Sequence, residues 1–265
     1  MKNYNKYFLI CIFTLFGFYY INKIIDYSEK NNVLLVSINN YAKDFDYKCR
    51  EGSITTDGIV LGLAGLKVNK DRSYNNMKGT LFNEKLIEYD KNDCILNKEN
   101  NLDKYIIKGN DYVNNISLVI DVDNLKYYRK MLKVGENNDI ELNLLMNFNN
   151  LRNEIDNIDN HSNILFKGKN KDELNDFIGI LHNEFYCVKN SEQDIIEMCK
   201  DKKINSINII NYVSDNLLSN TKKILDKGVI IFIKETNSNL NELSSTIKYI
   251  KSRGYNIVSI NELLS

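Results

Sequence analysis

The sequence contains no proline and only two histidines among its 265 residues. The absence of proline excludes any catalytic motif that depends on that residue. The histidines, His161 and His182, are 21 positions apart, and the five cysteines form no Cys-x-x-Cys pair. The residue types and spacings of a zinc-type cluster are therefore missing.

The cysteine spacing does not predict a disulfide framework either. Cys11 lies in an N-terminal apolar run, and the other four cysteines are Cys49, Cys94, Cys187 and Cys199. Buried free thiols are the expected state of these four, and pairing after export is the alternative.

The chain also lacks an excess of charge of either sign. It has 35 basic and 35 acidic residues, so its formal net charge is zero, and nucleic acid is not an expected partner. Its composition, 43% hydrophobic and 26% charged, is that of a globular protein. The length suits one domain of ordinary size and a smaller one.

The N-terminus carries the one long apolar run. Lys2 and Lys6 precede an uncharged stretch at residues 7–21, which further apolar residues extend to about 19 positions, close to the ~20 that span a bilayer. No small-residue cleavage site follows. We therefore predict an uncleaved signal anchor over residues 1–30, with a single transmembrane helix and the bulk of the chain extracytoplasmic. A cleaved signal peptide and a buried core helix are the alternatives.

The stretch from Gly228 to Leu264 predicts a strand–helix–strand unit. Residues 229–233 are a short apolar run of strand type, and Leu240 starts a series of apolar residues at helical spacing. Gly254 stands at the position of a helix C′ residue, and 255–260 is a second β-branched run. The two strands are expected to be parallel, with a right-handed connection.

Similar units repeat from residue 115 onward. Repeated βα units predict a parallel sheet, and periodicity alone does not separate a closed barrel from a doubly wound sheet. The expected strands are 116–122, 140–148, 164–167, 185–188 and 207–213, and the helices that follow them are 125–132, 151–158, 172–181, 191–200 and 216–225.

The C-terminal residues GYNIVSINELL resemble the GYKFVTVSELL ending of the polysaccharide deacetylase (NodB-homology) family. This resemblance implies a deformed seven-stranded (β/α) barrel over residues 113–265. In such a barrel the substrate groove is expected at the C-terminal ends of the strands.

Residues 31–112 are expected to form a small α+β module. Gly62 and Gly65 do not form a phosphate loop, because no Gly-Lys-Ser/Thr follows them. With Tyr74 and Met77 they instead match a segment that precedes the barrel in sporulation-associated deacetylases. A helix is expected over residues 69–78, with Asn69 as its N-cap.

The resemblance also implies an Asp general base, an Asp and two His that bind a divalent metal, and a His that acts as acid. The first motif, Thr-Phe-Asp-Asp-Gly, corresponds to residues 119–123. Asp121 matches the base, Val122 replaces the metal-binding Asp, and Asp123 is one residue further on. The alternative for Asp121 is a polar strand end that caps the next helix.

The other motifs are changed as well. The loop that should hold the His pair has Lys167, the Arg-Pro-Pro motif is replaced by residues 186–188 (Tyr-Cys-Val), and Lys234 stands where the family has its acid. Lysine has no lone pair for a metal when protonated. We therefore predict no bound metal and no cofactor. His161 and His182 are expected to be surface or helix-end residues.

Lys167 and Lys234 are expected to project with Asp121 and Asp123 into one groove. An ammonium group would then pair with Asp121 in place of the metal. The alternative is that both lysines point to solvent.

These features predict a membrane-anchored, extracytoplasmic deacetylase-like protein without catalytic activity that binds cell-wall or spore-envelope glycan. One alternative is an active deacetylase that hydrolyses N-acetyl C–N bonds of peptidoglycan or another glycan at an atypical site around Asp121. The other is a structural sporulation protein.

Overall fold

The computed structural model describes residues 13–21, 23, 32–156, 163–181, 183–189 and 194–265. The chain divides into two compact units. The first holds Met1–Cys49 and Ala64–Asn92, and the second holds Arg50–Leu63 and Asp93–Ser265. The expected boundary between residues 112 and 113 is therefore wrong, because segments 50–63 and 93–112 supply strands to the sheet of the second unit.

The first unit packs two helices against a hairpin. Its elements are α2 (Val33–Phe45), β3 (Gly65–Val68), α3 (Lys70–Met77), a 3-10 turn at Glu84–Leu86 and β4 (Tyr89–Asn92), which pairs antiparallel with β3. The side chain of Asn69 accepts a hydrogen bond from the N–H of Arg72, which confirms the predicted N-cap of α3. A small apolar core forms from Ile38, Ala42, Val68, Met77 and Ile87.

The predicted membrane anchor falls mostly on residues 1–12, 22 and 24–31, which are outside the described residues. Residues 13–21 are helical and their side chains are exposed. Among the described residues, no helix has both the length and the apolar character needed to cross a membrane.

The second unit is built on one large sheet. Its strands are parallel except for the β1–β2 hairpin, and β13 pairs with β6 beside the main path. The spatial order is β1-β2-β5-β10-β9-β8-β7-β6-β12-β11. The strands are β1 (Ser53–Ile54), β2 (Ile59–Val60), β5 (Tyr105–Lys108), β6 (Asn115–Asp121), β7 (Asn143–Met146), β8 (Ile164–Phe166), β9 (Tyr186–Val188), β10 (Ser206–Ile207), β11 (Tyr212–Val213), β12 (Ile230–Lys234) and β13 (Asn256–Ile257).

A short connection forces this sheet to curl. Five strands separate β10 from β11 in the sheet order, so a flat sheet would hold them roughly 29 Å apart. Only residues 208–211 join the two strands, and such a link spans at most about 18 Å. The sheet therefore bends into an incomplete barrel, which agrees with the expected deformed barrel and excludes a flat doubly wound sheet.

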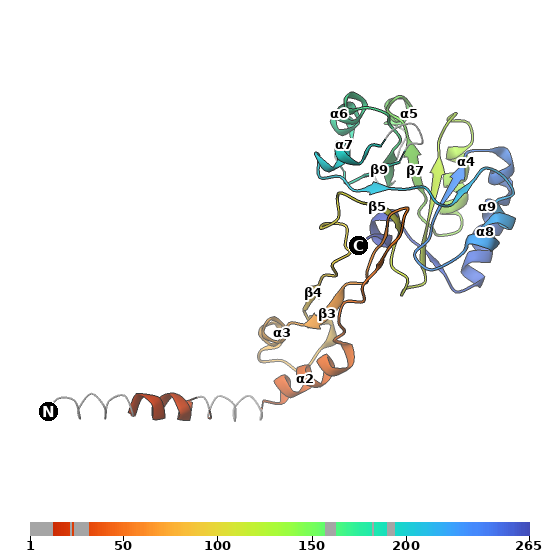
Figure 1. Ribbon diagram of the computed structural model, residues 1–265. Helices are drawn as coiled ribbons and strands as arrows, with labels where there is room; N and C mark the ends of the chain where they lie inside the picture. The colour runs from red at the N-terminus through yellow and green to blue at the C-terminus, as the bar shows by residue number, and fades with distance from the viewer. Residues whose placement is uncertain (1–12, 22, 24–31, 157–162, 182, 190–193) are drawn as a thin grey trace. The chain divides into compact units, whose positions relative to one another are not determined.

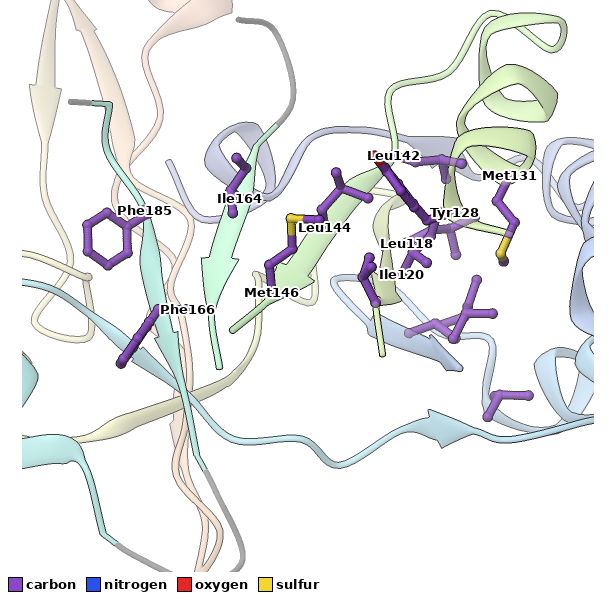
Figure 2. Packing of buried hydrophobic residues seen from close by; sticks show 14 of the residues in the cluster. Leu118, Ile120, Tyr128, Met131, Leu142, Leu144, Met146, Ile164, Phe166 and Phe185 are labelled. Atoms are coloured by element: carbon purple, nitrogen blue, oxygen red, sulfur yellow. The ribbon is translucent and has the colours of Figure 1, made fainter. Parts of the chain in front are cut away.

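Alternation along the strands produces two apolar cores. On the outer face, Leu118 and Ile120 of β6 pack with Tyr128 and Met131 of the following helix, and Figure 2 shows this cluster together with residues of β7 and β8. On the inner face, Val119, Leu145, Leu165 and Phe232 form a second cluster with the C-terminal residues Ile260, Leu263 and Leu264. Inner-face positions therefore alternate with outer-face positions up to the strand ends.

Helices cover the outer face. Helix α9 contacts both α4 and α8, and the three lie side by side in Figure 1. The φ of +80° at Gly254, directly after the C-cap Arg253, confirms the predicted C′ glycine. These helices are α4 (Tyr128–Glu136), α5 (Phe148–Glu154), α6 (Lys171–Ile180), α7 (Ile196–Lys200), α8 (Leu217–Ile224) and α9 (Asn237–Ser252), whereas α10 (Ile260–Leu263) packs against the inner face.

Two predicted strands differ from the structure. The strand expected at 207–213 is split into β10 and β11, because residues 208–211 leave the sheet to close the curl. The strand expected at 255–260 ends at Ile257, since Ser259 caps α10 by accepting a hydrogen bond from Glu262 N–H.

The prediction of free thiols is wrong for the second unit. Cys187 of β9 and Cys199 of α7 form a disulfide with a Cα–Cα distance of 6.5 Å, and both residues are fully buried. Cys49 and Cys94 are not free thiols either. The spacing could not show the pairing, because it depends on how α7 folds back against the sheet.

Candidate functional site

The polar side chains predicted from the sequence gather at the C-terminal ends of the parallel strands. Asp121 is the last residue of β6, and it lies on the inner face with only 3% of its surface exposed. Asp123 follows two residues later, and strand alternation gives it the same side. Val122 between them is fully buried in the outer core. It therefore faces away from the site, as well as lacking a ligand atom.

Lys167 joins the two carboxylates. It directly follows β8, and its Nζ lies 2.6 Å from Oδ1 of Asp121 and 2.8 Å from Oδ1 of Asp123. The ion pair expected between Lys167 and Asp121 is therefore present. Asp123 therefore meets the same ammonium group as Asp121.

Tyr212 is a site residue that sequence reasoning missed. Its hydroxyl donates to Oδ2 of Asp121 at 2.9 Å, so both oxygens of that carboxylate accept hydrogen bonds. Tyr212 belongs to β11, which pairs with β12, so it lies two strands from Asp121 in the sheet order. Its place at the end of a predicted strand was the one available signal.

The surroundings of Lys167 and Tyr212 raise the pKa values of both side chains. Burial lowers the pKa of the Lys167 ammonium, but hydrogen bonds to Asp121 and Asp123 outweigh burial and leave that pKa above its usual value. Partial burial, followed by the charge of Asp121, raises the pKa of Tyr212 well above that of a free phenol. The lysine stays charged and the tyrosine stays a neutral donor at neutral pH.

Lys234 ends β12 beside Asp121 but does not join the ion pair. Its backbone is in register with that of Asp121 across the β12–β6 ladder, and alternation places it on the inner face. Across the residues that the structure describes, Lys234 makes no ion pair. The expected lysine–carboxylate ion pair is therefore made by Lys167, and not by Lys234.

The neighbouring Glu235 performs the capping role that was the alternative for Asp121. Its buried carboxylate accepts hydrogen bonds from the backbone N–H groups of Asn124, Tyr127 and Tyr128, at the N-terminus of α4. A carboxylate at a helix N-terminus satisfies otherwise unpaired donors and the helix dipole. The loop after β12 therefore holds the N-terminus of α4 in place.

A cavity of about 510 Å³ lies beside the cluster. Lys167 and Tyr212 form part of its wall, so one side is polar and one is apolar. The lining residues are Leu145, Lys167, Val188, Lys189, Asn208, Ile209 and Tyr212. These come from β7, β9, β11 and the loops after β8, β9 and β10, which is where the resemblance implied a groove. Lys189 and Asn208 are further residues that sequence reasoning missed.

The residues present do not fit a divalent metal of the kind that the resemblance implies. The ammonium of Lys167 already occupies the position between the two carboxylates. His161 and His182, the only imidazoles of the chain, lie outside the described residues. The described part of the cluster therefore offers oxygen atoms alone, and a cation is already bound to them.

The fold of this chain is similar to that of several solved structures. A carbohydrate esterase family 4 pseudoenzyme from Bacillus anthracis, BA3943, superposes with a TM-score of 0.64, covering 88% of this chain and 95% of its own, at 18% identity. This chain has the polysaccharide deacetylase (NodB-type) fold. A mutant of that pseudoenzyme with restored enzymatic activity superposes with the same TM-score, 0.64, and the same 18% identity, over 88% of this chain and 98% of its own.

Two further structures share the fold. PdaA of Bacillus subtilis, a family 4 carbohydrate esterase, has a TM-score of 0.51 at 16% identity over 60% of this chain and 84% of its own. The Bc1960 peptidoglycan N-acetylglucosamine deacetylase has a TM-score of 0.53 at 13% identity over 60% and 92%. No sequence-family model matches the chain, and no curated protein matches it in sequence.

Proposed function

We propose that this protein is a membrane-anchored, extracytoplasmic deacetylase-like pseudoenzyme that binds cell-wall or spore-envelope glycan. The observation that carries the proposal is the state of Asp121. Its Oδ1 accepts from Lys167 and its Oδ2 accepts from Tyr212. A general base must accept a proton from a water molecule that it contacts. This carboxylate has both oxygens engaged, and the described residues place no metal ligand set around it.

The cavity supports the binding part of the proposal. Lys167, Lys189 and Asn208 offer donors, and Leu145, Val188 and Ile209 offer an apolar wall. A few polar groups on an apolar wall are typical of small-ligand sites, and sugars present both kinds of surface. Fold neighbours include a peptidoglycan N-acetylglucosamine deacetylase, which supports a cell-wall glycan as the ligand.

Two features support the extracytoplasmic location. Disulfides persist mainly in oxidising compartments, and Cys187 and Cys199 form a disulfide. The apolar N-terminal run that follows Lys2 and Lys6 has the order of an export signal. The location is tested by protease treatment of intact cells, where a protected chain would contradict the proposal.

Catalysis is tested with N-acetylglucosamine oligomers and purified peptidoglycan, with added zinc or cobalt. We expect no acetate release above the buffer rate. Release that depends on the protein and disappears in Asp121→Asn would establish the alternative of an active deacetylase with an atypical site.

Binding is tested by sedimentation with purified peptidoglycan and by titration with soluble glycan fragments. Ile209→Trp should fill the cavity and reduce binding at least about tenfold. Ile210→Trp is the matched control, because Ile210 is the next residue, is 47% exposed and does not line the cavity. Equal loss in both variants, or no binding by the wild type, would favour a structural sporulation protein instead.

A further inference from the structure

The ammonium of Lys167 makes the contacts that a bound cation would make. It lies 2.6 Å and 2.8 Å from one oxygen of each of two carboxylates, those of Asp121 and Asp123. Tyr212 holds the remaining oxygen of Asp121, which fixes the orientation of the carboxylate. Two carboxylates thus share one positive charge, and Tyr212 holds one of them through its other oxygen.

Removal of that charge would leave the cluster unbalanced. Two carboxylates would then share one site, and Asp121 has only 4% of its side chain exposed. Two neighbouring like charges repel each other, and a buried carboxylate without a partner lowers the stability of the fold. A cation from solution has a route to them, because Lys167 itself forms part of the cavity wall. Loss of its side chain would join the carboxylates to that cavity.

We propose that Lys167 is a built-in cation that keeps divalent metals out of this site, and that replacing it with a small neutral residue opens a divalent-cation site on Asp121 and Asp123. The ligand atoms are all oxygens, which selects hard ions such as Ca²⁺ and Mn²⁺ over zinc. The proposal is independent of glycan binding, because it concerns the cluster alone.

The test compares the wild type with Lys167→Ala, both without an affinity tag, after dialysis against a chelator. Thermal unfolding is followed with Ca²⁺, Mn²⁺ or Zn²⁺ at about 1 mM. We expect the wild type not to respond and to hold no stoichiometric metal by elemental analysis. The Tm of Lys167→Ala should rise by about 5 °C or more for an ion present at ~100 times its Kd.

The matched control is the double variant Asp123→Asn with Lys167→Ala, which should lose the response to the ions. Lys167→Ser provides a second test if Lys167→Ala does not fold, since serine is also small and neutral. A stoichiometric metal in the wild type would overturn the proposal. So would folded position-167 variants whose Tm does not respond to any of the ions, because Asp121 would then have taken up a proton instead.

Discussion

The Nζ atom of Lys167 lies 2.6 Å from Oδ1 of Asp121, whose side chain is 96% buried, whereas 37% of the lysine side chain is exposed. The pair links the end of β6 to the loop after β8, two strands away in the sheet. This contact therefore affects both the stability of the barrel mouth and its chemistry.

Replacing Lys167 alone should destabilise the fold more than replacing both partners of the ion pair. Lys167→Met leaves the Asp121 carboxylate buried without its charged partner, and we expect a loss of about 2–4 kcal/mol in the free energy of unfolding. Asp121→Asn combined with Lys167→Met should recover at least about 1 kcal/mol of that loss. Urea unfolding of the single and double variants measures the coupling.

The exposed pair of Lys171 and Asp201 is the control for this cycle. Its atoms are 3.6 Å apart and both side chains are about 60% exposed. Its coupling should be below about 0.5 kcal/mol. Equal coupling in the two pairs would show that Lys167 and Asp121 do not interact in solution as they do in the structure.

Gly168 should not tolerate a side chain. A Cβ atom there would lie 1.7 Å from the ring of Phe166, which is fully buried and packs at 4.9 Å between ring centroids against Phe177. Gly168→Ala should therefore destabilise the chain by about 1–3 kcal/mol. Gly179→Ala in α6 meets no atom within 4 Å, and it should be neutral or stabilise the helix by up to about 1 kcal/mol. Thermal unfolding of both variants checks the contrast.

The disulfide should stabilise the fold. Cys187 and Cys199 are 12 positions apart, and a loop of this size contributes roughly 2–3 kcal/mol in the chain-entropy model. The double variant Cys187→Ala with Cys199→Ala should lose about that amount in denaturant unfolding. A reductant should lower the stability of the wild type, and a variant that unfolds at the same denaturant concentration as the oxidised wild type would contradict the prediction.

The free energy of unfolding should decrease as the pH rises above 10. Burial, partly offset by the charge of Lys98, raises the pKa of Tyr186 from 10.0 to about 12. Because the folded chain holds this proton more tightly than the unfolded chain, the contribution is complete below pH 10 and is lost as the pH rises toward 12. A pKa difference of two units corresponds to about 2–3 kcal/mol in the free energy of unfolding.

Urea unfolding between pH 9 and 12 measures this loss. Tyr186→Phe should show a shallower decline than the wild type, and Tyr255→Phe, which removes a half-buried phenol on a different element, is the control. Parallel curves for the wild type and both variants would refute the assignment to Tyr186.

The sequence alone predicted much of the fold, because local signals specify local structure. Apolar runs and helical spacing identified the positions of β6, β8, β9 and β12 and of the helices that follow them. Asn69 and Gly254 were read correctly as the ends of α3 and α9, since each acts on its own backbone neighbours. Residue identities also placed Asp121, Lys167 and Lys234 at the ends of strands.

Only the tertiary structure decided which of those residues meet. The link at residues 208–211 splits a predicted strand and carries the chain from β10 to β11, where Tyr212 lies two strands from Asp121. The sheet order places Lys167 two strands from Asp121 on the other side, while Lys234, a neighbour in register, makes no ion pair in the described chain. Hydrophobic periodicity records which face of a strand is buried, but it carries no information about contacts between strands far apart in sequence. The chemistry of this site is therefore a property of the folded sheet.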